Sequence, residues 1–309
     1  MSLEVGLVGL PGSGKTTLFN ALTRGHVQLG EHGKPHVGVA PVADDRLEQV
    51  AAVIESPKRT VASIRIVDPA GTGVAHLGAL RGADALLAVL DAFSTDRSPE
   101  ETIEELELEL VVADRDHVER RLEKVRREAK SGAPEPKAEV ARLEQALVHL
   151  EAGGLLRDFA AGLPEELEPL TTKPLVPVVN GPSGIDAAYE AELAELPEED
   201  AVAFRDGEPS ALEEVTHDLR GALDLVTFFT ANENEARAWM LRRGRTALEA
   251  AATVHSDMAR GFIRCEVVHW RDLVEAGSRA ETVRRGLQRL EGRGYVVQDG
   301  DVLNIRFNV

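Results

Sequence analysis

The sequence predicts an α/β fold in which a mostly parallel sheet is covered by helices on both faces. Short, nearly all-apolar runs cover residues 3–8, 61–67, 85–90 and 174–180, and stretches with helical spacing separate them. Strands buried on both faces of a parallel sheet have this pattern. A long charged helical stretch interrupts the series, and a chain of 309 residues has room for two or three domains.

The segment GLPGSGKTT, residues 9–17, lies between the first apolar run and a helix predicted over residues 15–24. It matches G-x-x-x-x-G-K-[ST], in which glycines let backbone N–H groups point at phosphates near a helix N-terminus. Lys15 is expected to reach the outer phosphates and the Thr16 hydroxyl to hold Mg²⁺. The residues expected to bind nucleotide here are Gly9, Gly12, Ser13, Gly14, Lys15, Thr16 and Thr17.

A second element, Asp68-Pro69-Ala70-Gly71, follows the predicted strand over residues 61–67. It matches the D-x-x-G element of a nucleotide-hydrolysing switch. Asp68 is expected to bind Mg²⁺ through water, and the Gly71 N–H to sense the γ-phosphate. The alternative is an ordinary turn after a strand.

A third element is Asn180, which ends a later apolar strand and is followed by Gly181. This fold class places a base-recognition loop there, so Asn180 and Gly181 are candidate base contacts. No N-K-x-D motif is present, so guanine specificity is not supported. A plain turn asparagine is an equally open interpretation.

Residues 100–129 and 140–150 each carry a narrow apolar stripe and are separated by a Pro/Gly-containing turn, which predicts an antiparallel helical hairpin. Its start is acidic and the region near its turn is basic. The acidic residues are Glu100, Glu101, Glu104, Glu105, Glu107 and Glu109, and the basic ones are Arg120, Arg121, Lys124, Arg126, Arg127 and Lys130. This pattern either complements the helix dipole or indicates a projecting arm with a basic tip.

The composition is that of an ordinary soluble protein, with 43% hydrophobic and 28% charged residues. No apolar run is long enough to cross a membrane, and we expect no signal peptide and a cytoplasmic protein. The single cysteine, Cys265, excludes an intrachain disulfide and is expected to be buried.

The charge is unevenly distributed along the chain. The net charge is −18, yet residues 225–309 contain 13 Arg against 11 Asp plus Glu. That segment therefore carries +2 and the remainder −20. Because screening acts over about 8 Å at physiological salt, a basic face on one domain can still meet RNA.

A separate small domain is predicted from Leu225 onward. It alternates strands with helices that open at the capping boxes of Thr246 and Ser278, and it ends in a hairpin that turns at Asp299-Gly300. The predicted organisation is a nucleotide-binding domain in two parts, residues 1–98 and 164–224, a helical arm over residues 99–163, and the small domain over residues 225–309.

These features together resemble the YchF/Obg-like ATPase family over essentially the whole chain. The resemblance rests on GLPGSGKTT, DPAG, the arm segment ELVVADRDHVERRLEKV and, most specifically, FFTANENEARAWMLRRG, TALEAAATVHSDMARGFIRCEVV and YVVQDGDVLNIRFNV. It implies a Ras-like P-loop domain, an inserted coiled-coil arm and a C-terminal β-grasp-like TGS domain. It also implies ATP hydrolysis with Mg²⁺ and association with the ribosome.

The sequence departs from the family pattern at several points. Gly12 stands where the family has Asn, a residue associated with potassium-dependent hydrolysis in related NTPases. The segment between Gly25 and Pro41 is shortened and lacks the switch Thr, and Thr72 replaces a hydrophobic residue in a contracted switch. Ser183 replaces the Glu of N-x-x-E, so a weak preference for adenine is expected. Because of Gly12 and the missing switch Thr, slow hydrolysis of ATP or GTP is expected.

Two other functions remain open from the sequence. One is an RNA- or ribosome-binding module whose P-loop domain binds nucleotide and barely hydrolyses it. The other is a small-molecule P-loop kinase, which is disfavoured because no Arg-rich lid is evident and the C-terminal domain would have no role.

Overall fold

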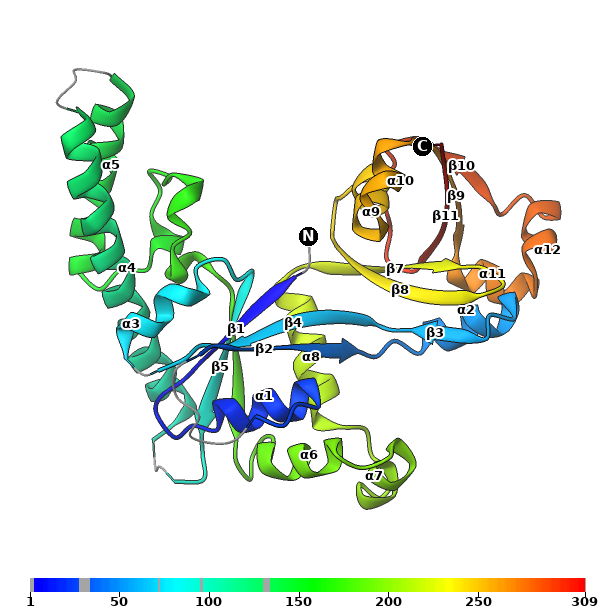
Figure 1. The fold of residues 1–309 in the computed structure, drawn as a ribbon, viewed down its shortest axis with the longest axis horizontal. Coiled ribbons are helices and arrows are strands. Elements are labelled where there is room, and N and C mark those ends of the chain that lie inside the picture. Colours follow the sequence, from blue (N-terminus) through cyan, green and yellow to red (C-terminus); the bar gives the residue numbers. More distant parts are fainter. Residues whose placement is uncertain (1–2, 28–33, 72, 95–96, 130–133, 309) are drawn as a thin grey trace. The chain divides into compact units, whose positions relative to one another are not determined.

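The computed structural model describes residues 3–27, 34–71, 73–94, 97–129 and 134–308 (Figure 1). The chain forms two compact units. The N-terminal unit comprises Leu3–Val39 and Arg65–Val215, and the C-terminal unit comprises Ala40–Ile64 and Thr216–Val309. Residues 40–64, which the sequence assigned to the nucleotide-binding domain, thus cluster with the C-terminal part of the chain.

The first sheet has the strand order β2-β4-β1-β5-β6. Its strands are β1 (Glu4–Val8), β2 (His36–Val42), β4 (Ala62–Asp68), β5 (Ala85–Asp91) and β6 (Leu175–Asn180). β1 pairs in parallel with both β4 and β5, and β5 pairs in parallel with β6. The predicted α/β class with a mostly parallel sheet is therefore confirmed. β2 is not among the predicted strands, because an edge strand with a half-exposed, Gly- and Pro-containing sequence gives a weak apolar signal.

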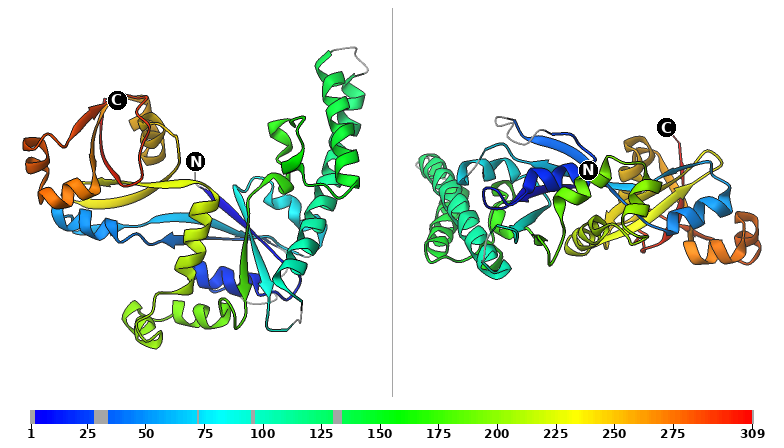
Figure 2. Two further views of the ribbon diagram at one scale, coloured as in Figure 1. Left: turned by 180° about the vertical axis from the view of Figure 1, so that it is seen from behind. Right: turned by 90° about the horizontal axis from the view of Figure 1, so that it is seen from below.

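Helices follow the strands in the N-terminal unit. They are α1 (Lys15–Thr23), α3 (Val74–Leu77), α4 (Pro99–Ala129), α5 (Pro134–Glu151), α6 (Ala187–Ala194) and α7 (Glu198–Phe204), with 3-10 turns at Gly78–Leu80, Leu156–Asp158, Glu165–Leu167 and Leu170–Thr172. α8 (Ala211–Ala222) leads on to the second unit. α6 packs against α1, and both views of Figure 2 show them side by side.

The predicted helical hairpin is confirmed. α4 and α5 run side by side (Figures 1 and 2), with a buried seam of Leu122 and Val125 from α4 and Leu143 and Leu150 from α5. Two ion pairs join the helices, Arg121–Glu139 at 2.7 Å and Arg126–Glu144 at 2.8 Å. Two of the basic residues near the turn are therefore paired with acidic residues of α5. Lys130 lies outside the described residues.

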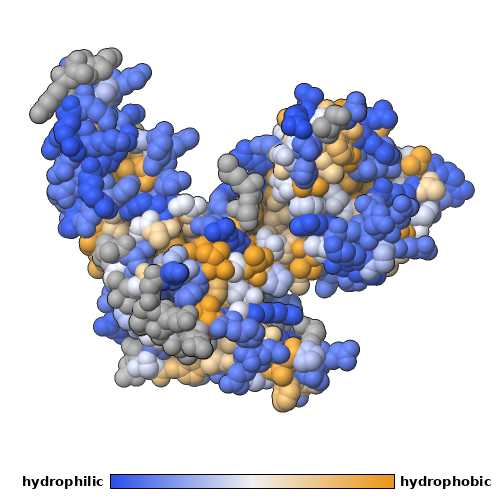
Figure 3. Space-filling model, viewed as in Figure 1, coloured by the Kyte–Doolittle hydropathy of each residue, from blue (hydrophilic) through white to orange (hydrophobic). Residues whose placement is uncertain are grey.

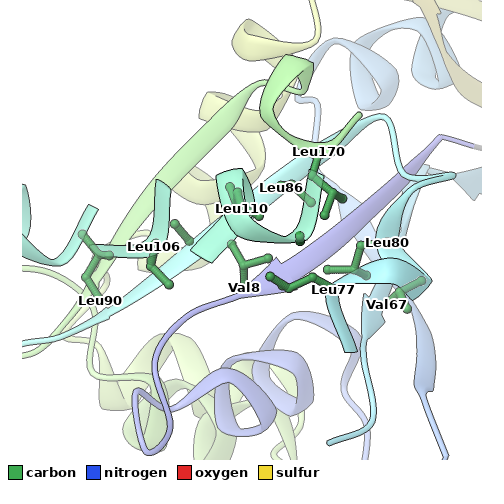
Figure 4. Close-up of a cluster of buried hydrophobic side chains, with 11 residues drawn as sticks. Val8, Val67, Leu77, Leu80, Leu86, Leu90, Leu106, Leu110 and Leu170 are labelled. Atoms are coloured by element: carbon green, nitrogen blue, oxygen red, sulfur yellow. The ribbon is translucent and has the colours of Figure 1, made fainter. Parts of the chain in front are cut away.

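The root of the hairpin packs on the sheet through one apolar cluster (Figure 4). Leu106 and Leu110 of α4 meet Val8 at the end of β1 and Leu77 of α3. Leu10 of the phosphate loop packs against the same cluster. The arm helix is thus fastened beside both the phosphate loop and the segment after Asp68.

A buried carboxylate reinforces this root. Asp114 of α4 is 1% exposed and pairs with Arg81, which follows the turn after α3, at 2.7 Å. Asp114 also accepts hydrogen bonds from the backbone N–H groups of Leu170 and Thr171 and from the Thr171 hydroxyl. Because these four donors are directed at its charge, the burial of the carboxylate is compensated.

The C-terminal unit contains a sheet of order β10-β9-β11-β7-β8-β3. Its strands are β3 (Lys58–Thr60), β7 (Leu225–Ala231), β8 (Glu235–Arg242), β9 (Phe262–His269), β10 (Arg289–Glu291) and β11 (Asp301–Phe307), and its helices are α2 (Arg46–Ile54), α9 (Ala247–Val254), α10 (Ser256–Arg260), α11 (Trp270–Ala276) and α12 (Arg279–Arg284). β3 extends this sheet by pairing in parallel with β8, and α2 packs against β7, β8 and α11. These contacts explain why residues 40–64 cluster with this unit.

The capping box at Thr246 is present as predicted, with reciprocal bonds to Glu249. The predicted final hairpin is wrong. β11 pairs with β9 and β7, while the Val297 N–H donates to the Arg245 carbonyl instead. The turn at Asp299-Gly300 does form, with the Asp301 N–H donating to the Gln298 carbonyl at 3.2 Å, but the segments on either side of it do not pair. The Asp299 carboxylate accepts from the Thr227 N–H and pairs with Arg46 and Arg220.

Cys265 lies in the core of this unit, where burial raises the pKa of its thiol to about 12. The expectation that Cys265 is buried is confirmed. Among the described helices, none combines the length and hydropathy needed to cross a membrane.

We predict that Asp114→Ala lowers the free energy of unfolding by about 3–5 kcal/mol, because it leaves the half-buried Arg81 without its carboxylate. Urea unfolding measures the change. Asp116→Ala is the matched control, since its ion pair with Arg115 on the same helix is exposed and contributes about 0–1 kcal/mol. Equal effects of the two substitutions would contradict the assignment of Asp114 as the buried anchor.

Candidate nucleotide site

The phosphate loop connects β1 to α1, as the sequence predicted. Gly12 has φ +82° and Gly14 has φ +93°, backbone conformations that favour glycine. A Cβ on Gly14 would lie 2.3 Å from the Asn180 side-chain nitrogen. Gly14 is therefore required both for the turn into α1 and for the close approach of Asn180.

Lys15 begins α1 and folds back over the loop. Its ammonium donates hydrogen bonds to the carbonyls of Gly9 at 2.9 Å and Leu10 at 3.0 Å. Burial lowers the pKa of Lys15, and the charges of Asp68 and Glu109 oppose that shift. The described partners of this cation are thus carbonyls of its own loop, which a phosphate oxygen could replace.

Thr16 and Asp68 meet although 52 positions separate them in sequence. The Thr16 hydroxyl donates to the Asp68 carboxylate at 2.7 Å, and Asp68 at the end of β4 is 3% exposed. A hydroxyl and a carboxylate side by side are hard oxygen donors, which suit Mg²⁺. These two residues fit the magnesium site that the sequence predicted. Among the described residues, no group of three or more His, Cys, Asp or Glu forms a separate metal site.

Ser13 gives a second indication that the loop is shaped for a ligand. Its side chain is 1% exposed, and its hydroxyl oxygen has no hydrogen-bond partner in the described part of the chain. A buried polar group without a partner is costly. Thr17 follows in the first turn of α1 and is half-buried.

Asn180 is brought to the phosphate loop, but its side chain is already engaged on both sides. Its amide donates to the Ser13 carbonyl at 3.0 Å and accepts from the Ala187 N–H at 3.1 Å. The Gly181 N–H donates to the Ile185 carbonyl at 2.9 Å. Asn180 thus joins the phosphate loop to the start of α6. A contact of Asn180 or Gly181 with a nucleotide base stays a prediction.

The switch segments differ in how much the structure describes. Gly71 has φ +93° and is exposed, and contact of its N–H with a γ-phosphate stays a prediction. Thr72 lies outside the described residues. Residues 25–43 contain neither Ser nor Thr, so this segment offers no hydroxyl for a second protein ligand to Mg²⁺.

Two interactions were not predicted from the sequence. Glu109 lies close enough to Lys15 to influence its pKa, although the sequence showed it only as one of many acids at a helix start. The Arg81–Asp114 pair could not be predicted, because its members are 33 positions apart and give no local signal.

The fold and the loop together define a P-loop nucleotide-binding protein, and comparisons with known proteins agree. The family model MMR_HSR1, described as "50S ribosome-binding GTPase", matches residues 4–134. The model YchF-GTPase_C, described as "Protein of unknown function (DUF933)", matches residues 225–308.

The whole chain also matches named relatives. It is 33% identical to the ribosome-binding ATPase YchF of Haemophilus influenzae and 34% identical to that of Bacillus subtilis, with 100% of each chain covered. The structure of the Schizosaccharomyces pombe YchF GTPase matches with a TM-score of 0.79 at 25% identity, covering 99% of this chain and 98% of that one. The chain therefore belongs to the YchF family. The alignment with the Haemophilus protein spans 364 positions, so the relative contains segments that this chain of 309 residues lacks.

We predict that Lys15→Ala weakens ATP binding about a hundredfold or more, because it removes charge-assisted hydrogen bonds of about 1.5–3 kcal/mol each. Calorimetric titration measures the affinity. Lys137→Ala, an exposed position on α5, is the control. ATP binding at the wild-type affinity by the Lys15 variant would show that the loop is not the phosphate site.

We predict that Asn180→Ala weakens ATP and GTP binding by the same factor, because its two bonds shape the loop that holds phosphates. Competition between the two nucleotides gives the ratio of affinities. A ratio that changes severalfold relative to wild type would instead assign Asn180 to base recognition. Ser183→Ala, at an exposed position in the same loop, is the matched control.

Proposed function

We propose that this chain is a Mg²⁺-dependent nucleoside triphosphatase of low activity that uses ATP, or GTP, and acts at the ribosome. The observation that carries the enzymatic part is the 2.7 Å hydrogen bond between Thr16 and Asp68 beside the Lys15 ammonium. A cation, a hydroxyl and a carboxylate converge there on a loop of backbone N–H groups. Phosphoryl transfer needs little more than such positioning and charge stabilisation.

Each residue has a distinct task in this proposal. Lys15 exchanges its carbonyl partners for phosphate oxygens and neutralises charge on the outer phosphates. Thr16 and Asp68 hold the metal ion, which when bound withdraws charge from the phosphates. The loop N–H groups from Gly12 to Thr16 fix the phosphate chain at the N-terminus of α1.

Hydrolysis is expected to be slow, because the switch segments supply few groups for the transition state. No hydroxyl is available from residues 25–43, and no side-chain general base is assigned. The alternative of a nucleotide-binding module that barely hydrolyses ATP differs only in rate. Single-turnover hydrolysis separates the two, whereas a screen of phosphoryl acceptors tests the disfavoured kinase alternative.

Selectivity between ATP and GTP is expected to be weak. Ser183 is exposed and offers a neutral hydroxyl where the family has Glu, and the Gly181 N–H is held by Ile185. Hydrogen bonds to charged groups contribute about 1.5–3 kcal/mol against about 1 kcal/mol for neutral ones. The named relatives include both an ATPase and a GTPase, which supports a proposal that covers both adenine and guanine nucleotides.

Ribosome association is proposed from the names of the bacterial relatives and from the distribution of charge. Arg120, Lys124 and Arg127 are exposed on α4 near the turn of the hairpin. Residues 225–309, the proposed TGS domain, carry +2 within a chain of −18. Both are suited to phosphate contacts with ribosomal RNA, and such a role would place the protein in the cytoplasm.

We predict slow ATP hydrolysis that changes little when potassium replaces sodium, because Gly12 provides no side chain to help coordinate a monovalent cation. Phosphate release in matched chloride buffers measures the rate. Restoring the family residue with Gly12→Asn is the informative companion variant, since asparagine tolerates this backbone conformation better than other residues. A large potassium stimulation of the wild-type protein would refute the prediction.

We predict that the triple substitution of Arg120, Lys124 and Arg127 by Glu weakens ribosome binding and flattens its salt dependence. Each lost phosphate contact should reduce the slope of log K against log salt by roughly 0.7–0.9. Co-sedimentation at several salt concentrations measures the slope. Arg121 and Arg126 are left unchanged, because their ion pairs with α5 would confound folding with binding. An unchanged slope would mean that these side chains are exposed to solvent and make no phosphate contacts with the ribosome.

A further inference from the structure

The helices α6 and α7 carry a group of exposed apolar side chains that the nucleotide site does not use. They are Tyr189, Leu196, Val202 and Phe204, and Phe204 is the most exposed at 65%. Figure 3 shows apolar surface among hydrophilic surface where α7 lies, at the lower edge of the view. Isolated apolar residues are normal on surfaces, but two of these four, Tyr189 of α6 and Phe204 of α7, are joined by a hydrogen bond.

This group is held in place. The Tyr189 hydroxyl donates to the Phe204 carbonyl at 2.9 Å, which ties α6 to the end of α7. α6 is anchored on α1 and buries Ala187 and Leu193. Glu190, 5% exposed, accepts from the Ser210 hydroxyl at 2.8 Å and fixes the chain that follows α7. The backbone that carries Tyr189 and Phe204 is therefore fixed by contacts with α1 and by hydrogen bonds that join α6 to the end of α7 and to the segment after it.

The surroundings of this group are strongly acidic. Residues 186–214 contain eleven Asp or Glu and a single basic residue, Arg205. Arg205 is itself mostly buried and lies 3.9 Å from Glu190. Glu195, Glu199, Asp200 and Glu208 are exposed. A negative potential of this kind repels nucleic acid and anionic lipid and attracts a cationic partner.

We propose that the α6–α7 surface, defined by Tyr189 and Phe204, docks a basic protein segment that carries at least one apolar anchor. Its acidic surroundings set the charge of the partner, and the exposed aromatic residues supply the apolar contact that a purely electrostatic attraction would lack. Aromatic residues that become buried at the centre of an interface dominate binding energy. This surface is independent of the basic residues proposed to meet RNA.

The test uses labelled peptides and the full-length chain. One peptide is an amphipathic helix of lysine and leucine, the second has serine for every leucine, and the third has glutamate for every lysine. Fluorescence anisotropy measures binding to the wild-type protein and to the Phe204→Ser variant. Val148→Ser on α5 is the matched control, since Val148 is also an exposed apolar side chain.

The lysine–leucine peptide is expected to bind the wild-type chain and the Val148 control equally, with an affinity that falls as salt rises. Phe204→Ser should weaken it about tenfold or more, as expected when a buried aromatic contact is lost. The double charge reversal Glu199→Lys and Asp200→Lys should weaken it too. Neither the serine nor the glutamate peptide should bind comparably.

Several results would overturn the proposal. They are no binding of the lysine–leucine peptide, equal binding of the serine peptide, or an unchanged affinity in the Phe204 variant. Binding to phosphatidylglycerol vesicles that is lost in Phe204→Ser would assign the aromatic side chain to a membrane surface and would equally refute it.

Discussion

The hydrogen bond between Thr16 and Asp68 is the contact on which the candidate site depends. It joins α1, the helix after β1, to the end of β4. β1 and β4 are neighbouring parallel strands, so their carboxyl ends lie at the same edge of the sheet. Parallel pairing places the two segments together, and the glycine loop between β1 and α1 then directs its N–H groups to the same place. Asn180, the last residue of β6, brings the end of a third strand to the phosphate loop by donating a hydrogen bond to the Ser13 carbonyl. Three segments remote in sequence are thereby fixed around one position.

The same edge of the sheet carries the root of the helical arm. Leu106 and Leu110 of α4 pack with Val8, which directly precedes the phosphate loop, and with Leu77, which follows the D-x-x-G segment. The Arg81–Asp114 pair fastens the chain after α3 to the same helix. Movement of the segment after Asp68 would therefore have to repack a dense apolar cluster or break a buried ion pair. The packing gives the arm a physical link to the nucleotide site within one unit of the chain.

Much of this arrangement could be predicted from the sequence, because the informative signals were local. The apolar strands, the glycine loop, the hairpin and the capping box at Thr246 each depend on residues close together in the chain. The failures have non-local causes. β2 pairs at a sheet edge with a half-polar sequence, β3 becomes a strand only beside β8, and Asp299 is held by Arg46 and Arg220 rather than by a hairpin. The sequence predicted that Asn180 lies at a strand end near the site, but it could not predict the hydrogen bonds of its side chain to the phosphate loop and to α6.

The central claim is that Lys15, Thr16 and Asp68 form a site for a nucleoside triphosphate with its metal ion. The most direct measurement is calorimetric titration of the full chain with a non-hydrolysable ATP analogue, with and without Mg²⁺. The account predicts saturable binding at one site, strengthened by Mg²⁺, with that gain lost when Asp68 is replaced by Ala. Absence of binding, or an affinity that is the same with and without the metal ion, would contradict it.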